Sequence, residues 1–219
     1  MKNVKRSAVC CFLLPLVVVM PLCAEGETVK ETAQSYIEMG ENFAAHRDWV
    51  RAIGAYTIAL QFTPKSAPAF FRRGQAFDGQ GDTAKALADY SMAIDLDPAF
   101  GRAWYNRGNL RLKSGDYEAA LSDLTNAVER DPGYARAYNN RGIARVATGD
   151  SDGGMADFAE AIKLDPNDPQ PYVNRGLLLF RQGLKTEAEK DFARSIAINP
   201  SIKAFLDTRL SHAAFAPVR

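Results

Sequence analysis

Four aspartates recur in this sequence at one constant interval, and carboxylates in such a row could serve acid–base catalysis or bind metal ions. They are Asp89, Asp123, Asp157 and Asp191. Each has one arginine before it and another after it at fixed spacings, and these arginines are Arg73, Arg107, Arg141, Arg175 and Arg209. A carboxylate between two guanidinium groups is better explained by ion pairing than by catalysis. We therefore predict a continuous structural ladder of Arg/Asp pairs across neighbouring elements.

Other residues that commonly act as nucleophiles or metal ligands are sparse. The two histidines, His46 and His212, are far apart in the sequence, and the three cysteines, Cys10, Cys11 and Cys23, all lie near the N-terminus. No metal-ligand spacing and no phosphate-binding loop is present in the sequence. We therefore predict a protein that is not an enzyme and that uses no metal and no small-molecule cofactor.

The aspartates belong to a longer repeating unit, which has an aromatic residue at position 4, glycine at position 8 and proline at position 32. Five such units follow one another from residue 33 to residue 202 without an insertion. The aromatic position holds Tyr36, Phe70, Trp104, Tyr138 and Tyr172, the glycine position Gly40, Gly74, Gly108, Gly142 and Gly176, and the proline position Pro64, Pro98, Pro132, Pro166 and Pro200.

This pattern resembles the tetratricopeptide repeat, in which each unit folds as two antiparallel helices. The resemblance implies an all-α protein, a right-handed α-solenoid of five helix-turn-helix repeats closed by a C-terminal capping helix. The predicted boundaries are a lead-in at 27–32, repeats at 33–66, 67–100, 101–134, 135–168 and 169–202, and a capping helix and tail at 203–219.

The third unit shows how one repeat is expected to fold. A first helix at about 102–114 should end at Gly115, which tolerates a left-handed backbone, and Asp116 can cap the second helix. Position 8 is glycine in every unit, so neighbouring helices can approach closely while the large residues at positions 4 and 24 fill the core. The fifth unit has Leu184 where others have the capping aspartate, so we expect no side-chain cap there.

Residues 1–26 have the features of a secretory signal peptide, because three basic residues precede an apolar run that extends from Ala8 to Ala24. Cleavage could follow Ala24 or Gly26. An uncleaved membrane anchor is the alternative, but this run contains two prolines and is shorter than the roughly 20 residues of a membrane-spanning helix. Lipidation of Cys23 is a minority interpretation, since the bulky Leu22 precedes it. We expect a periplasmic or secreted protein.

The composition is that of an ordinary folded protein, with 47% apolar and 24% charged residues and a formal net charge of +1. A nucleic-acid partner is not expected, because binding phosphates needs a concentrated basic face. The charge and composition place no limit on a protein partner.

In the resembled fold the first helix of each repeat lines a concave groove, so a partner is expected to contact its exposed positions. These positions form a mildly basic, amide-rich set, whereas the first unit has Glu38 and Glu41 there. Side-chain amides can bond to an extended peptide backbone, and arginine can hold a carboxylate. The expected binding residues are Arg72, Arg102, Tyr105, Asn106, Asn109, Lys113, Arg136, Asn139, Asn140 and Asn174.

The resemblance leaves the partner open. Chaperone-binding members of the family grip a C-terminal carboxylate with basic residues, and here those positions hold Tyr105, Gln170 and Asn174, so we do not expect that activity. The leading hypothesis is an exported adaptor that binds a protein or extended peptide in its groove. The alternatives are an assembly component of a cell-envelope complex that acts through self-association or its convex face, and a groove that is merely solvated.

Overall fold

The computed structural model describes residues 29–213, which form eleven α-helices and no β-strand, so the predicted all-α class is confirmed. The predicted signal peptide at 1–26 and the end of the C-terminal tail lie outside the described residues. The helices are α1 Val29–Ala45, α2 Trp49–Phe62, α3 Ala67–Gln80, α4 Thr83–Leu96, α5 Gly101–Lys113, α6 Tyr117–Arg130, α7 Ala135–Ala147, α8 Ser151–Leu164, α9 Pro169–Arg181, α10 Lys185–Ile198 and α11 Ile202–Ala213.

Helix α1 begins earlier than the sequence suggested. The lead-in expected at 27–32 is helical from Val29 onwards. Nothing in that stretch breaks a helix, and Glu31 in the first turn interacts favourably with the positive end of the helix dipole.

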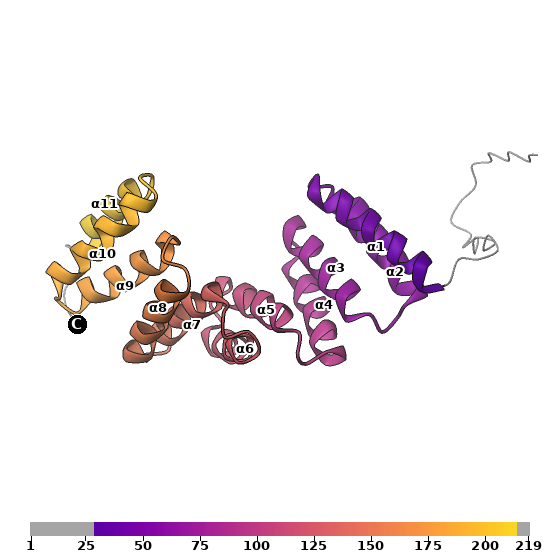
Figure 1. The fold of residues 1–219 in the computed structure, drawn as a ribbon, viewed down its shortest axis with the longest axis horizontal. Helices are drawn as coiled ribbons and strands as arrows, with labels where there is room; N and C mark the ends of the chain where they lie inside the picture. Colours follow the sequence, from indigo (N-terminus) through magenta and orange to yellow (C-terminus); the bar gives the residue numbers. More distant parts are fainter. Residues whose placement is uncertain (1–28, 214–219) are drawn as a thin grey trace, which may run out of the picture.

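The helices pack as consecutive hairpins that stack into a solenoid. Each first helix lies against the second helix of its own hairpin, as α5 does against α6, and each second helix contacts the first helix of the next hairpin. Successive first helices also contact one another, as α5 does α7 and α7 does α9, whereas successive second helices do not approach as closely. The stack therefore curves toward its first helices, and Figure 1 shows the open arch that results, with α1 and α2 at one end and α9 to α11 at the other.

Turn chemistry sets the ends of the helices. In the third hairpin Gly115 has a φ of +80°, and the side chain of Asp116 accepts a hydrogen bond from the backbone N–H of Ala119, as the sequence predicted. Asp82 and Asp150 cap α4 and α8 in the same way. Helix α10 begins at Lys185, and its N-cap residue Leu184 makes no side-chain capping bond, which confirms the expectation for the fifth unit.

The core lies between the two helices of each hairpin and between neighbouring hairpins. Position 24 supplies its largest members, and Tyr56, Tyr90, Leu124 and Phe158 are all almost completely buried. The glycine facing each of them leaves no room for a side chain, because a Cβ on Gly142 would lie 2.7 Å from Cε1 of Phe158. Close approach of the helices therefore explains glycine at this position.

Four of the five aromatic residues at position 4 are less buried than expected, and the exception is the buried Tyr172. Trp104 is only half-buried, and its Nε1 donates a hydrogen bond to the carbonyl oxygen of Pro98 at 3.0 Å. The guanidinium carbon of Arg107 lies 5.0 Å from the centre of the Trp104 ring, and Arg141 lies over Tyr138 in the same way. These rings pack against arginine as well as against the core, because an aromatic side chain can bury one face and keep polar contacts at its edge.

Candidate functional site

The structure brings together the Arg/Asp pairs that lie within one hairpin. In the third hairpin Arg107 donates from Nε to Oδ2 of Asp123 at 2.9 Å and from Nη2 to Oδ1 at 2.8 Å. This two-bond geometry is the strong form of the arginine–carboxylate interaction. The same fork joins Arg73 to Asp89, Arg141 to Asp157, and Arg175 to Asp191.

Contacts between hairpins differ from the predicted continuous ladder. Among the described residues no ion pair joins one of these aspartates to the ladder arginine of the following hairpin. Instead, Arg107 donates from Nη1 to the hydroxyl of Ser91 at 2.9 Å, and Arg73 donates to the hydroxyl of Thr57 at 3.2 Å. The carboxylates are already occupied within their own hairpins, as at Asp123, which also accepts a bond from Arg111 at 2.8 Å.

The ladder also stops before the last helix. Arg209 was expected to pair with Asp191, but its guanidinium group lies over the Phe205 ring, 5.6 Å from the ring centre. Asp191 is already held by both nitrogens of the Arg175 fork. Arg209 is therefore an exposed cation on α11 rather than a rung of the ladder.

Most predicted groove cations have no carboxylate partner. Arg102 on α5 and Arg136 on α7 are exposed, as is Lys113, and none of the three makes an ion pair with another described residue. Arg72 is the exception, because its Nη2 lies 3.0 Å from Oε1 of Glu41 on α1. The acidic first hairpin therefore neutralises Arg72, which leaves the positive charge of the groove on α5 and the helices that follow.

The predicted asparagines form a connected row of amides across the first helices. Asn140 on α7 donates to Oδ1 of Asn109 on α5 at 3.1 Å, and Asn139 donates to Asn140 at 3.1 Å. Asn174 on α9 donates to Oδ1 of Asn139 at 2.8 Å. Asn139 is 7% exposed, so it positions the row, while the other three remain partly accessible. Each amide has more hydrogen-bonding groups than these contacts use.

Two tyrosines lie beside the exposed arginines. The rings of Tyr105 on α5 and Tyr134, just before α7, have centres 4.6 Å apart, and the Tyr105 hydroxyl accepts a bond from Asn140 at 3.5 Å. Burial raises the pKa of Tyr105 to about 12, so its phenol stays neutral at physiological pH. Asn106 is turned toward the preceding hairpin and donates to the Tyr90 hydroxyl at 3.4 Å. Asn106 therefore has a bonding partner inside the array.

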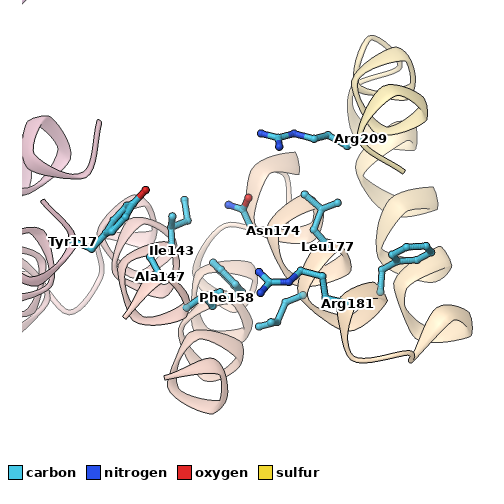
Figure 2. A pocket seen from close by; sticks show the side chains of 11 residues that line it. Tyr117, Ile143, Ala147, Phe158, Asn174, Leu177, Arg181 and Arg209 are labelled. Atoms are coloured by element: carbon cyan, nitrogen blue, oxygen red, sulfur yellow. The ribbon is translucent and has the colours of Figure 1, made fainter. Parts of the chain in front are cut away.

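An apolar hollow of about 650 Å³ lies beyond the amide row, toward the C-terminal end of the arch. Figure 2 shows that its wall comes mainly from α7 and α9, with Tyr117 at one end and Arg209 on α11 at the other. The apolar lining residues were not among the predicted binding residues. They are Ile143, Val146, Ala147, Leu177, Leu178, Phe180 and Phe158.

A sequence signal for this hollow exists. Position 9 holds the amides Gln75 and Asn109 in the second and third units, but the aliphatic residues Ile143 and Leu177 in the fourth and fifth. A polar helix face that becomes apolar over two units is a sequence signal for an apolar surface, because an exposed face of a helix is ordinarily polar. The prediction missed it because it gave weight to polar side chains alone.

The histidines take no part in a catalytic or metal-binding cluster in the described residues. The Nδ1 atom of His46 lies 2.8 Å from the carbonyl oxygen of Asn42, one turn earlier in α1, and the side chain of His212 lies outside what the structure describes. Within the described part of the chain, no group of three His, Cys, Asp or Glu side chains could hold a metal ion. None of the described helices has the length and apolar character needed to span a bilayer.

The fold defines a class of protein, an α-solenoid repeat scaffold. Two family models described as tetratricopeptide repeat match the chain, one at residues 105–169 and 156–201 and the other at residues 67–100. These ranges together cover more than half of the sequence, and the chain therefore belongs to the tetratricopeptide repeat family. Such folds are generally non-catalytic scaffolds for protein–protein interaction. No curated protein sequence matches the chain.

Solved structures share this architecture at low sequence identity. MamA from Desulfovibrio magneticus RS-1 is 21% identical with a TM-score of 0.71, over 79% of this chain and 98% of that one. YrrB, described as a TPR protein with an unusual peptide-binding site, is 22% identical with a TM-score of 0.69, over 82% and 93% of the two chains. Pseudomonas aeruginosa pilF is 21% identical with a TM-score of 0.69, over 85% and 89%. These similarities show the solenoid fold.

Proposed function

We propose that this protein is an exported adaptor that binds an extended segment of a protein partner along the concave side of α5, α7 and α9. One observation carries the proposal. The arginines between the helix layers are bound to carboxylates, whereas Arg102 and Arg136 on the concave side are exposed and make no ion pair with a described residue. An exposed pair of unmatched cations attracts an anionic group, so the partner segment is acidic.

The amide row supplies the other contacts. Asn109, Asn140 and Asn174 lie on successive first helices, so a chain that crosses α5, α7 and α9 passes each of them in turn. Their remaining hydrogen-bonding groups can bond to a peptide backbone whatever its side chains are. The buried amide of Asn139 joins Asn140 to Asn174 and keeps the row in place before a partner binds. Such preorganisation lowers the entropic cost of binding.

The proposed export rests on the N-terminal sequence. Residues 1–26 combine a basic start, an apolar run and small residues at two possible cleavage points. The repeats that follow contain no cysteine, which suits an oxidising compartment. Mass spectrometry of the protein secreted or retained by its source cell tests this directly. A mature N-terminus at Glu25 or Glu27 is expected, and an intact Met1 N-terminus on exported protein would contradict cleavage.

Affinity capture tests the groove. The purified repeat protein is used to capture proteins from an envelope extract of the source cell, beside the double variant Arg102→Glu/Arg136→Glu. The matched control is Arg47→Glu/Lys190→Glu, which reverses two exposed charges on the α1–α2 turn and on α10, outside the groove. A partner captured by the wild-type protein and the control should be lost with the groove variant, because its acidic segment is repelled.

Two results would count against the groove. Capture that the groove variant performs as well as the wild-type protein rules out Arg102 and Arg136 as contacts. A stable homo-oligomer in light scattering, with no captured partner, favours the alternative of an assembly component that associates with itself. Circular dichroism of each variant shows that it remains folded, so that loss of capture reflects the surface.

A further inference from the structure

We propose that the apolar hollow between α7, α9 and α11 is the specificity pocket of the groove, and that it accepts a large apolar side chain flanked by acidic residues in the bound peptide. This inference rests on the proposed function and adds the sequence type of the ligand. Binding of the peptide then has two contributions, a backbone contact along the amide row and a side-chain contact in the hollow.

The hollow is large enough to admit a bulky side chain. Its volume of about 650 Å³ falls in the range of roughly 300–1,000 Å³ that is typical of small-ligand sites. Ile143 and Val146 on α7, and Leu177 and Phe180 on α9, are only half-buried, so part of their apolar surface contacts water. Covering that surface with an aromatic or branched side chain is favourable, at about 25 cal/mol for each Å² removed from water.

The rim of the hollow is positively charged. Arg181 at the end of α9 and Arg209 on α11 both line it, and no acidic residue does. Neither arginine makes an ion pair with another described residue. In Figure 2 both guanidinium groups reach from the α9 and α11 side toward the hollow, with the Asn174 amide between them in this view. Two such cations beside an apolar floor select an apolar residue with acidic neighbours.

The hollow is continuous with the amide row. Asn174 belongs to both, because it lines the hollow and also donates to Asn139 in the row. A peptide backbone that follows the row from α5 toward α9 therefore reaches the hollow at Asn174, where one of its side chains can enter. This continuity favours a peptide as the occupant.

A selection experiment tests the pocket even while the natural partner is unidentified. The wild-type repeat protein is used to select from a displayed library of random dodecapeptides, and the enriched sequences are synthesised with a fluorescent label for polarisation measurements. We expect the enriched peptides to share an aromatic or leucine residue next to aspartate or glutamate. Replacing that apolar residue by alanine in the synthetic peptide should weaken binding by about tenfold or more, through loss of the buried side chain.

Two variants of the protein locate the binding. Leu177→Gln places in α9 the residue type that Gln75 supplies at the same position of α3 and makes the floor polar. Arg181→Glu/Arg209→Glu reverses the rim. Each should weaken binding of the selected peptide by about tenfold or more, whereas Arg47→Glu/Lys190→Glu should change it by less than about twofold. Thermal unfolding followed by circular dichroism confirms that each variant is folded at the assay temperature.

The possible failures are distinguishable. If binding falls with Arg102→Glu/Arg136→Glu but is unchanged in both hollow variants, the groove binds peptide and the hollow is not its specificity pocket. If the enriched sequences lack acidic residues, the role of the rim is wrong. If no peptide is enriched, or if binding is unchanged in all three variants, both the groove function and the pocket are rejected.

Discussion

Asp123 offers the most direct test of how the solenoid is held together. Its side chain is 1% exposed and receives three hydrogen bonds from two arginines, two from Arg107 and one from Arg111, all between 2.8 and 2.9 Å. The variant Asp123→Ala removes the charge that these guanidinium groups face. Arg107 is itself only 13% exposed, so solvent cannot readily replace the carboxylate.

The expected loss of stability follows from the burial of Asp123 and Arg107. Removing one partner of a buried ion pair typically costs about 3–5 kcal/mol, because the remaining charge stays buried without compensation. We expect Asp123→Ala to lower the free energy of unfolding by that amount. Asp191→Ala should cost less, about 2 kcal/mol, because its one ion-pair partner among the described residues is Arg175, which is 26% exposed. The exposed Asp95→Ala on α4 is the control and should change stability by less than about 0.5 kcal/mol.

Urea unfolding followed by circular dichroism at the helix band measures these differences. The slope of each transition has to be compared as well, because repeat arrays can unfold in segments and then no single free energy applies. A loss below about 1 kcal/mol for Asp123→Ala, or a loss equal to that of Asp95→Ala, would show that the pair contributes little.

A second substitution tests the cause of the loss. In the Asp123→Ala background, Arg107→Met removes the uncompensated guanidinium group, together with its contact with the Trp104 ring, and keeps a side chain with an apolar stem. Part of the lost stability should return, because the penalty comes from an uncompensated charge. If the double variant is less stable than Asp123→Ala alone, the explanation by buried charge is refuted.

Two further predictions concern packing and pH. Gly142→Ala should destabilise the protein by about 1–3 kcal/mol, because the new Cβ would lie 2.7 Å from the Phe158 ring. Gly54→Ala should instead stabilise α2 by up to about 1 kcal/mol, because a Cβ there would meet no atom within 4 Å. Urea unfolding measures both changes. Burial raises the pKa values of Tyr56 and Tyr105 from 10.0 to about 12. The stability that their neutral phenols provide is complete below pH 10 and is lost between pH 10 and 12, where the unfolded chain ionises first. Wild-type unfolding free energy should therefore fall more steeply over that interval than that of Tyr56→Phe/Tyr105→Phe, and equal slopes would contradict the prediction.

The repeat pattern made most of the fold predictable. Glycine and aspartate at the turn, as in Gly115 and Asp116, act through their own backbone and side chain, so a single sequence suffices to place them. The missing cap at Leu184 was predictable for the same reason. The burial of Trp104 was overestimated. Helical spacing shows which residues share a face of the helix, but it does not show that the Trp104 side chain contacts an arginine and a backbone carbonyl group in place of part of the core.

The site was less predictable because it depends on contacts between hairpins. Arg72 was expected to contribute charge to the groove, but Glu41 of the preceding hairpin neutralises it. The ladder failed to continue between hairpins for a related reason. Counting residues places Asp123 and Arg141 at one level, but it does not show that Arg107 and Arg111 already occupy both oxygens of Asp123.

The arginines of the charge ladder and those of the first helices differ in their carboxylate partners. In the third hairpin the buried Asp123 binds Arg107 and Arg111, whereas Arg102 makes no ion pair with a described residue. The first hairpin has no ladder arginine, and its Glu41 binds Arg72 of the next hairpin. The predicted groove cations without an ion-pair partner among the described residues therefore lie on α5 and α7, and Arg72 on α3 is not one of them. An acidic partner should cover the stretch from α5 to α9, with its apolar anchor at the α9 end, and should leave α1 and α3 uncovered, which protection from hydrogen exchange in the complex would show.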